Sequence, residues 1–350
     1  MTIRSILLLT CATLALGACG KSQTAAAAPT APAPAPLTLA GSVDLPGYKG
    51  DFDHFAVDEK DNRLFLAGEE SAELEVFDLT TGALEKRLTG YGVPHSLHLT
   101  PATGELLVVD GGKPSQVLDA KTLMEKRTIK LPAGADSADF DSSNGHLWIV
   151  TGGKDVPLPD SHLSEIDPAT GKVFHDVRFD ADHVEALAVQ QAGPKLFINV
   201  TDKNYLAVID KTSGKVVDKW KIKEAEQNAP VAMDEKNHRL FVVTRKPGKL
   251  VVINADTGAT VASFKAPERT DQVTWDPDNR RVYVTGGEGY ISVVQQDDAD
   301  HYREIAKIPS LPGAKTAILA PSVHRLYVAA SPGESGAMGK VMWYTIAPRG

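Results

Sequence analysis

The chain has 350 residues, of which 42% are hydrophobic and 23% are charged, a composition typical of a folded globular body. Its formal net charge of −8 disfavours a sequence-independent nucleic-acid binder, because such a protein needs a basic surface. We therefore expect no nucleic acid among its partners.

Residues 1–18 have the features of a secretion signal. Arg4 precedes an apolar stretch from Ile6 to Leu16 that is too short to span a bilayer as a helix. The run Leu16-Gly17-Ala18-Cys19 resembles a bacterial lipobox, in which the cysteine is lipidated and becomes the first residue of the mature chain. We expect Cys19 to be the lipid attachment site. The alternative is an ordinary secreted protein that is cut near Ala18.

Residues 19–36 contain the lipidated cysteine followed by alternating Ala and Pro, which favours an extended spacer. Cleavage would remove Cys11, so the mature chain would have no thiol for a disulfide or a metal site. The expected localisation is the periplasm or cell envelope, with membrane contact through the N-terminal lipid alone. No Asp follows the cysteine, where Gly20 and Lys21 stand, and a resemblance to enterobacterial sorting therefore favours the outer membrane.

One position recurs seven times in residues 37–350, at intervals of 41 to 49 residues. The residues at this position are Asp53, His95, Asp136, Glu185, Ala229, Asp271 and Lys315. A period of about 40–45 residues is typical of a propeller blade. Each repeat contains four short β-branched or aromatic segments separated by turn residues. We predict an all-β fold, a seven-bladed β-propeller of four-stranded antiparallel blades.

A turn between the third and fourth strands recurs in the same phase. It begins with Asp or Asn, which can bond its own backbone, and ends with Gly, which accepts a left-handed conformation. The four copies are Asp78–Gly82, Asp167–Gly171, Asp210–Gly214 and Asn254–Gly258. The last repeat lacks a fourth strand. Because an open edge invites aggregation, we predict that residues 37–46 close the ring by pairing with residues near 340–346.

The second strands carry a recognisable motif. Val282-Tyr283-Val284-Thr285-Gly286 closely matches the YVTN repeat, and Leu240–Thr244 and Leu147–Thr151 are variants of it. From residue 37 to about 347, the chain resembles the YncE-like family of YVTN seven-bladed propellers, which are related to lactonase-like propellers. The resemblance implies the fold more strongly than an activity, because this scaffold hosts unrelated functions.

The antiparallel strands should place the recurring position around the channel mouth on one face of the propeller. Asp53, Glu185 and Asp271 are the candidate ligands of a divalent cation there. Oxygen ligands favour calcium or magnesium, and adding His95 would admit zinc or manganese. Gluconolactonase-type propellers hold a divalent metal at this mouth, and by this resemblance only Asn228 matches their asparagines. The alternative is that the acids are solvated channel lining, screened by water and Lys315.

Two further features could contribute to this face. His98 and Asp139 of the next repeat could form a pair, or His98 could simply make a core hydrogen bond. The loop from Gly152 to His162 is longer than its counterparts. It could overhang the mouth and bring Lys154, Asp155 and His162 near the recurring position, or it could be a surface insertion.

Two functions fit these features. The first is a tethered binding module that presents the channel-mouth face to a small molecule or a protein. The second is a metal-dependent hydrolase of lactones or similar cyclic esters. In it His95 or Asp136 would move the proton and Lys315 would hold an oxyanion. The chain has no Gly-x-Ser-x-Gly elbow, phosphate loop or dinucleotide fingerprint to suggest another chemistry.

Overall fold

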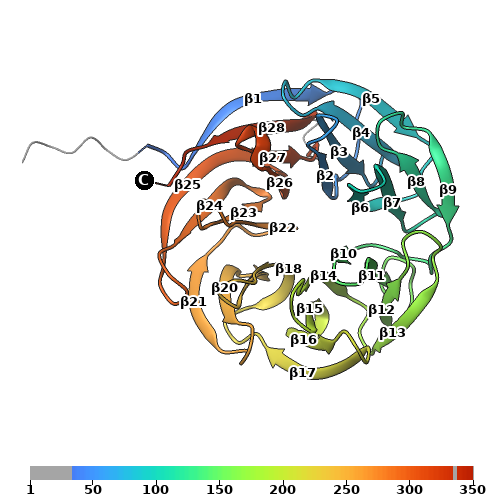
Figure 1. Cartoon of the computed structure of the whole chain (residues 1–350). Coiled ribbons are helices and arrows are strands. Elements are labelled where there is room, and N and C mark those ends of the chain that lie inside the picture. Colours follow the sequence, from blue (N-terminus) through green and yellow to red (C-terminus); the bar gives the residue numbers. More distant parts are fainter. Residues whose placement is uncertain (1–33, 334–336, 350) are drawn as a thin grey trace, which may run out of the picture. The chain divides into compact units, whose positions relative to one another are not determined.

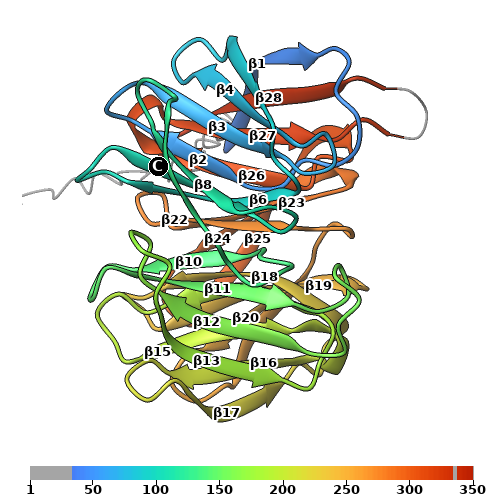
Figure 2. The same cartoon turned by 90° about the vertical axis from the view of Figure 1, so that its right-hand side faces the viewer.

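In the computed structural model, which describes residues 34–333 and 337–349, seven four-stranded antiparallel sheets surround a central channel. Figure 1 looks down this channel and Figure 2 shows the blades from the side. The predicted seven-bladed β-propeller is therefore confirmed. The predicted signal peptide, Cys19 and most of the linker lie outside the described residues.

Each blade has four strands, which follow one another from the channel outwards. The first two blades are β2 (Phe55–Asp58), β3 (Arg63–Gly68), β4 (Glu73–Asp78) and β5 (Leu84–Thr89), then β6 (Pro94–Thr100), β7 (Glu105–Asp110), β8 (Ser115–Asp119) and β9 (Glu125–Ile129). The next two are β10 (Ala138–Asp141), β11 (His146–Gly152), β12 (Ser161–Ile166) and β13 (Val173–Phe179), then β14 (Val184–Val189), β15 (Lys195–Val200), β16 (Tyr205–Asp210) and β17 (Lys215–Lys221). The fifth and sixth are β18 (Glu226–Asp234), β19 (Arg239–Lys246), β20 (Gly248–Asn254) and β21 (Thr260–Lys265), then β22 (Gln272–Asp276), β23 (Arg281–Gly286), β24 (Glu288–Gln296) and β25 (Tyr302–Pro312).

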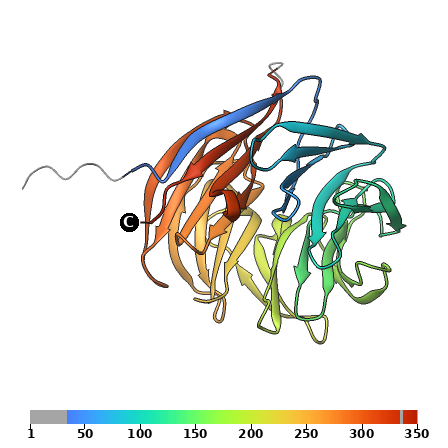
Figure 3. The same cartoon turned by 45° about the horizontal axis from the view of Figure 1, so that its top comes forward.

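The last blade joins the two ends of the described chain. Its inner strands are β26 (Thr316–Ala320), β27 (Arg325–Ala330) and β28 (Gly339–Ile346), and its outer strand is β1 (Leu37–Leu45). Leu37 lies opposite Ile346 and Leu45 lies opposite Gly339 in an antiparallel pair. Figures 1 and 3 show β1 alongside β28. The N-terminal strand therefore supplies the missing strand, as predicted from the sequence.

Two single 3-10 turns interrupt the strands, η1 (Thr201–Lys203) and η2 (Pro321–Val323). Within the described ranges, neither of these turns nor any other helix has the length and apolar character of a membrane span.

The core lies between the blades, where apolar side chains of neighbouring sheets interdigitate. Phe65, Phe197 and Phe241 of the second strands are fully buried there. The first strands of successive blades contact one another around the whole ring. This packing fixes the position of every first strand, and so of the residues at the channel mouth.

The recurrent turns contribute to this packing. A Cβ added to Gly258, whose φ is +73°, would lie 2.5 Å from the Trp220 ring of the preceding blade. Gly82 has the same relation to Trp343. Glycine is therefore needed for the left-handed backbone and also for the close approach of the neighbouring ring. Blade two has the same turn, but Leu123 instead of glycine holds the left-handed position, at φ 63°. The sequence pattern therefore did not identify this copy of the turn.

Candidate functional site at the channel mouth

A cavity of about 390 Å³ opens at one end of the channel. Its lining includes six of the seven residues of the recurring position: Asp53, His95, Asp136, Glu185, Asp271 and Lys315. They lie at the start of the first strands or up to two residues before them. The seventh, Ala229, is buried and does not line the cavity. The period of the repeat therefore brings these six side chains to one place.

On the side formed by blades one to three, His95 lies between two carboxylates. Its Nδ1 is 2.6 Å from Asp53 Oδ2 and 3.6 Å from Asp136 Oδ1. Burial alone would lower the pKa of His95, but Asp136 and Asp53 raise it to about 10. Burial would raise the pKa of Asp53, but His54 and His95 lower it to about 2. At neutral pH an imidazolium therefore stands beside an ionised Asp53.

On the opposite side, two basic side chains join three acids. Arg245 Nη1 lies 2.9 Å from Glu185 Oε1, and its Nη2 lies 2.5 Å from Asp271 Oδ1. Lys315 Nζ lies 2.8 Å from Asp271 Oδ2 and 2.7 Å from Asp51 Oδ2. Burial would raise the pKa of Glu185, but the Arg245 guanidinium and the nearby His183 hold it well below its usual range. Acidic and basic groups thus alternate around much of the mouth.

The alternation fails at Glu69 and Asp136. Among the described residues, no partner forms a hydrogen bond with the Glu69 carboxylate, and burial together with Asp53 raises its pKa to about 7. Asp136 lies near Glu185 of the next blade, and Lys154 lines the same part of the mouth. Burial and the charges of Asp53 and Glu185 outweigh His95 and raise the pKa of Asp136 to about 6. Negative charge is least compensated at these two carboxylates.

Asp53, Glu185 and Asp271, the three predicted metal ligands, line the same cavity, but in the described part of the chain their ligand atoms do not form one close group. Carboxylate oxygens of Glu185 and Asp271 already form ion pairs with the Arg245 guanidinium and the Lys315 ammonium group. In the described part of the chain, the acids and histidines whose ligand atoms lie within 4.8 Å of one another are Asp53, Glu69 and His95. A metal there would have to displace the proton that His95 shares with Asp53. A metal site formed by Asp53, Glu185 and Asp271 therefore stays a prediction.

The long loop of blade three lies partly at the mouth. Lys154 and Asp155 line the cavity, and the Lys154 backbone N–H donates to the Asp182 carbonyl at 2.7 Å. His162 instead pairs with Asp176 of the outer strand, at 2.9 Å. The loop therefore brings two of the three expected residues to the mouth.

His98 and Asp139 do not form the pair that the sequence suggested. The His98 ring stacks on Phe140, and burial lowers its pKa to about 4. Its Nε2 is buried and has no hydrogen-bond partner among the described residues. Asp139 accepts instead from the backbone N–H of Val189 at 2.8 Å and of Phe140 at 2.9 Å. Burial raises the pKa of Asp139 to about 6, against the effect of these two bonds.

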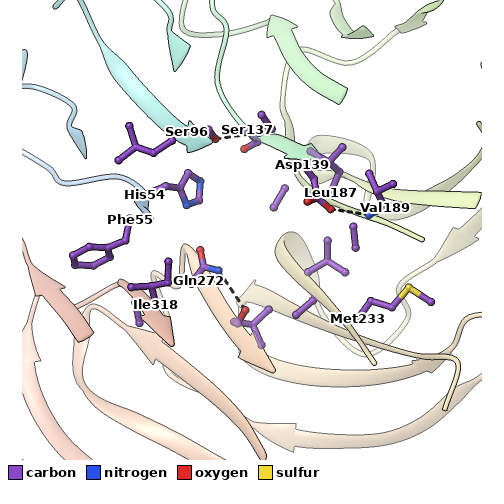
Figure 4. Close-up of a pocket in the computed structure, with 18 residues that line it drawn as sticks. His54, Phe55, Ser96, Ser137, Asp139, Leu187, Val189, Met233, Gln272 and Ile318 are labelled. Atoms are coloured by element: carbon purple, nitrogen blue, oxygen red, sulfur yellow. Dashed lines mark hydrogen bonds between the residues drawn. The ribbon is translucent and has the colours of Figure 1, made fainter. Parts of the chain in front are cut away.

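A second cavity, of about 370 Å³, occupies the channel itself (Figure 4). It shares His54, Ser137 and Ala186 with the mouth, so the two cavities adjoin. Most of its other lining residues are apolar or small. Asp139 is the acidic residue in this lining.

Sequence reasoning gave no role to four charged residues that line the mouth, which are Asp51, Glu69, Arg245 and Arg269. Asp51 and Arg269 each stand two places before a residue of the recurring position, and Arg245 follows the YVTN-like strand of blade five. Arg269 Nη2 donates to the Gly287 carbonyl. A search for charges flanking the recurring position would have found Asp51 and Arg269.

The fold and this mouth define the class: a seven-bladed β-propeller with a charged channel opening, a fold that serves as a binding or scaffold module. No protein-family model matches the chain. The uncharacterised protein YncE of Salmonella typhimurium and that of Salmonella typhi are each 24% identical to it over 199 residues. This is 55% of this chain and 54% of each relative, so the chain spans about half the length of the curated relatives it matches. The chain is therefore a seven-bladed propeller that is similar in sequence to the YncE proteins over about half of its length.

Solved structures show the same fold at low sequence identity. A chain of a mitotic checkpoint complex aligns with a TM-score of 0.68 and 17% identity, over 97% of this chain and 99% of that one. A chain of hydrazine synthase from Kuenenia stuttgartiensis aligns with a TM-score of 0.69 and 15% identity, over 84% of this chain and 97% of that one. At these identities, the likeness concerns the fold alone.

Proposed function

We propose that the protein is an envelope-anchored binding propeller that holds a small cationic ligand at the channel mouth. The observation that carries this proposal is the charge of the cavity lining, which has seven acidic and four basic side chains besides His54 and His95. The bases Arg245 and Lys315 are already engaged by acids. A ligand cation placed beside Glu69 and Asp136 would supply the charge that this side lacks.

The anchoring part of the proposal rests on residues 1–36, with lipid on Cys19 and a periplasmic or outer-membrane location. A protein that docks on the mouth face is the other occupant consistent with the proposal. The mitotic checkpoint neighbour, whose propeller is part of a protein complex, supports such use of the fold only by analogy.

Calorimetric titration with butylamine tests the ligand. Removing one charge by Asp136→Asn should weaken binding about ten-fold, which corresponds to about 1.4 kcal/mol. The control is Asp256→Asn, at an exposed acid that pairs with His238 away from the mouth. Equal affinities of both variants and the wild type would exclude the mouth as the amine site.

The metal-dependent hydrolase is the second candidate, and the grouping of Asp53, Glu69 and His95 favours it. Here a bound divalent cation would polarise a carbonyl or activate water. Elemental analysis of the purified protein, followed by lactone hydrolysis with and without chelator, tests this candidate. Protein that contains no metal and shows no turnover would remove it.

A further inference from the structure

The channel extends the mouth site inward along one strand of blade three. Asp136 lines the mouth, Asp139 lines the channel, and Ser137 lines both cavities. Asp136 stands two residues before β10 and Asp139 lies within it, and at about 3.3 Å per residue this step spans about 10 Å of extended backbone. Figure 4 shows Ser137 and Asp139 with His54 around the same opening. Two carboxylates therefore stand at different depths of two adjoining cavities.

Ser137 is an independent sign of a ligand between them. The residue is only 4% exposed, yet its side chain lines both cavities. Its hydroxyl makes no hydrogen bond with any residue in the described ranges. Because the hydroxyl opens into the channel and has no such partner, a polar group of a ligand there would form a hydrogen bond with it.

The wall around Asp139 includes apolar side chains against which a hydrocarbon chain can pack. Leu97, Leu187, Val231 and Val273 lie on different first strands around this cavity. None of its described lining residues is lysine or arginine, so Asp139 has no basic neighbour in the channel wall. A ligand that reaches Asp139 should be slender, apolar along its length and positively charged at its inner end.

We propose that the channel binds a linear diamine or polyamine, with one ammonium group beside Asp136 and Glu69 and the next beside Asp139. The Ser137 hydroxyl accepts a hydrogen bond from the ligand, and the methylene chain lies against the apolar wall. This inference rests on the proposed function, because the mouth must first accept a cation. A single metal ion does not fit this arrangement, since carboxylates on residues about 10 Å apart along the backbone cannot share its coordination sphere.

The test compares 1,8-diaminooctane with octylamine by titration calorimetry on the purified protein. Carbon–carbon bonds of about 1.5 Å give the eight-carbon chain a length of roughly 10 Å, so the two ligands differ only in the second ammonium group. Wild type should bind the diamine about ten-fold more tightly than the monoamine. Asp139→Asn should abolish this preference and leave octylamine affinity unchanged, whereas Asp136→Asn should weaken both ligands. Ser137→Ala keeps every charge and should weaken the diamine about three-fold.

The outcomes separate the two proposals. Equal wild-type affinities for the two amines would overturn the diamine inference and leave the cation site at the mouth intact. If neither amine binds, the proposed function fails as well. Should Asp139→Asn not fold, the comparison of the two ligands on wild type and on Ser137→Ala still decides the question. A preference for the diamine that survives Asp139→Asn in a folded protein would also overturn the inference.

Discussion

His95 of blade two approaches Asp53 of blade one to 2.6 Å, through Nδ1 and a carboxylate oxygen. The contact joins neighbouring first strands at the mouth, where Arg245 and Lys315 make the equivalent connections on the opposite side. The propeller thus compensates several of its mouth acids with its own side chains. Any ligand must use the charge that remains, at Glu69 and Asp136.

The His95–Asp53 contact should make stability depend on pH in the alkaline range. Folding raises the pKa of His95 from about 6.5 to about 10, so its contribution is fully present below about pH 6.5 and is lost as pH rises through about 10. Between pH 6 and pH 10, the unfolding free energy of wild type should fall by at least about 2 kcal/mol more than that of His95→Gln, because one pKa unit corresponds to about 1.4 kcal/mol. Denaturant unfolding across this range measures the difference. The exposed His238→Gln is the control, and parallel curves for wild type and His95→Gln would contradict the prediction.

Arg245 should stabilise the folded protein because it compensates the charges of two acids at once. Arg245→Gln leaves Glu185 and Asp271 without their guanidinium, and we expect a loss of about 3 kcal/mol in unfolding free energy. Added calcium or magnesium should then raise the melting temperature of the variant more than that of wild type, because a cation replaces the lost charge. Arg303→Gln, in an exposed pair with Asp297, should cost less than about 1 kcal/mol. An Arg245 variant as stable as wild type and indifferent to both ions would refute this role.

The period, the turns and the closing strand were predictable from the sequence because each is encoded locally. Asp78 bonds the Thr81 backbone within its own turn, and Gly82 supplies a positive φ, so such a turn can be recognised from a few letters. The turn of blade two escaped because Leu123 holds the left-handed position.

The pairings at the mouth were not predictable in the same way. The repeat placed Glu185 and Asp271 at one opening, but Arg245 reaches both from a different blade position. Which acid a long side chain reaches depends on its rotamer and on the approach of neighbouring blades, and sequence spacing encodes neither. His98 shows the same limit, since it stacks on Phe140 rather than pairing with an acid.

Cys19 should decide whether the protein stays with the membrane. Several acyl chains on this residue would anchor it, since each buried methylene contributes about 0.8 kcal/mol. We expect Cys19→Ala to move the protein from the membrane fraction to the soluble fraction after cell lysis, with immunoblotting as the readout. Cys11→Ala lies in the segment predicted to be removed, and it should leave the distribution unchanged. Retention of the Cys19 variant in membranes would rule out the lipid anchor.

Gly258 should tolerate substitution less well than other glycines with the same backbone conformation. Gly145 has φ +79° and no atom near the position of an added Cβ, so Gly145→Ala tests the left-handed backbone alone and should cost about 1 kcal/mol. Gly258→Ala meets the Trp220 ring as well, and we expect a further 1–3 kcal/mol, roughly the cost of overpacking. Unfolding by denaturant, followed by Trp fluorescence, measures both. If the two variants lose the same stability, the turn glycine serves only the backbone and the packing of neighbouring blades does not require it.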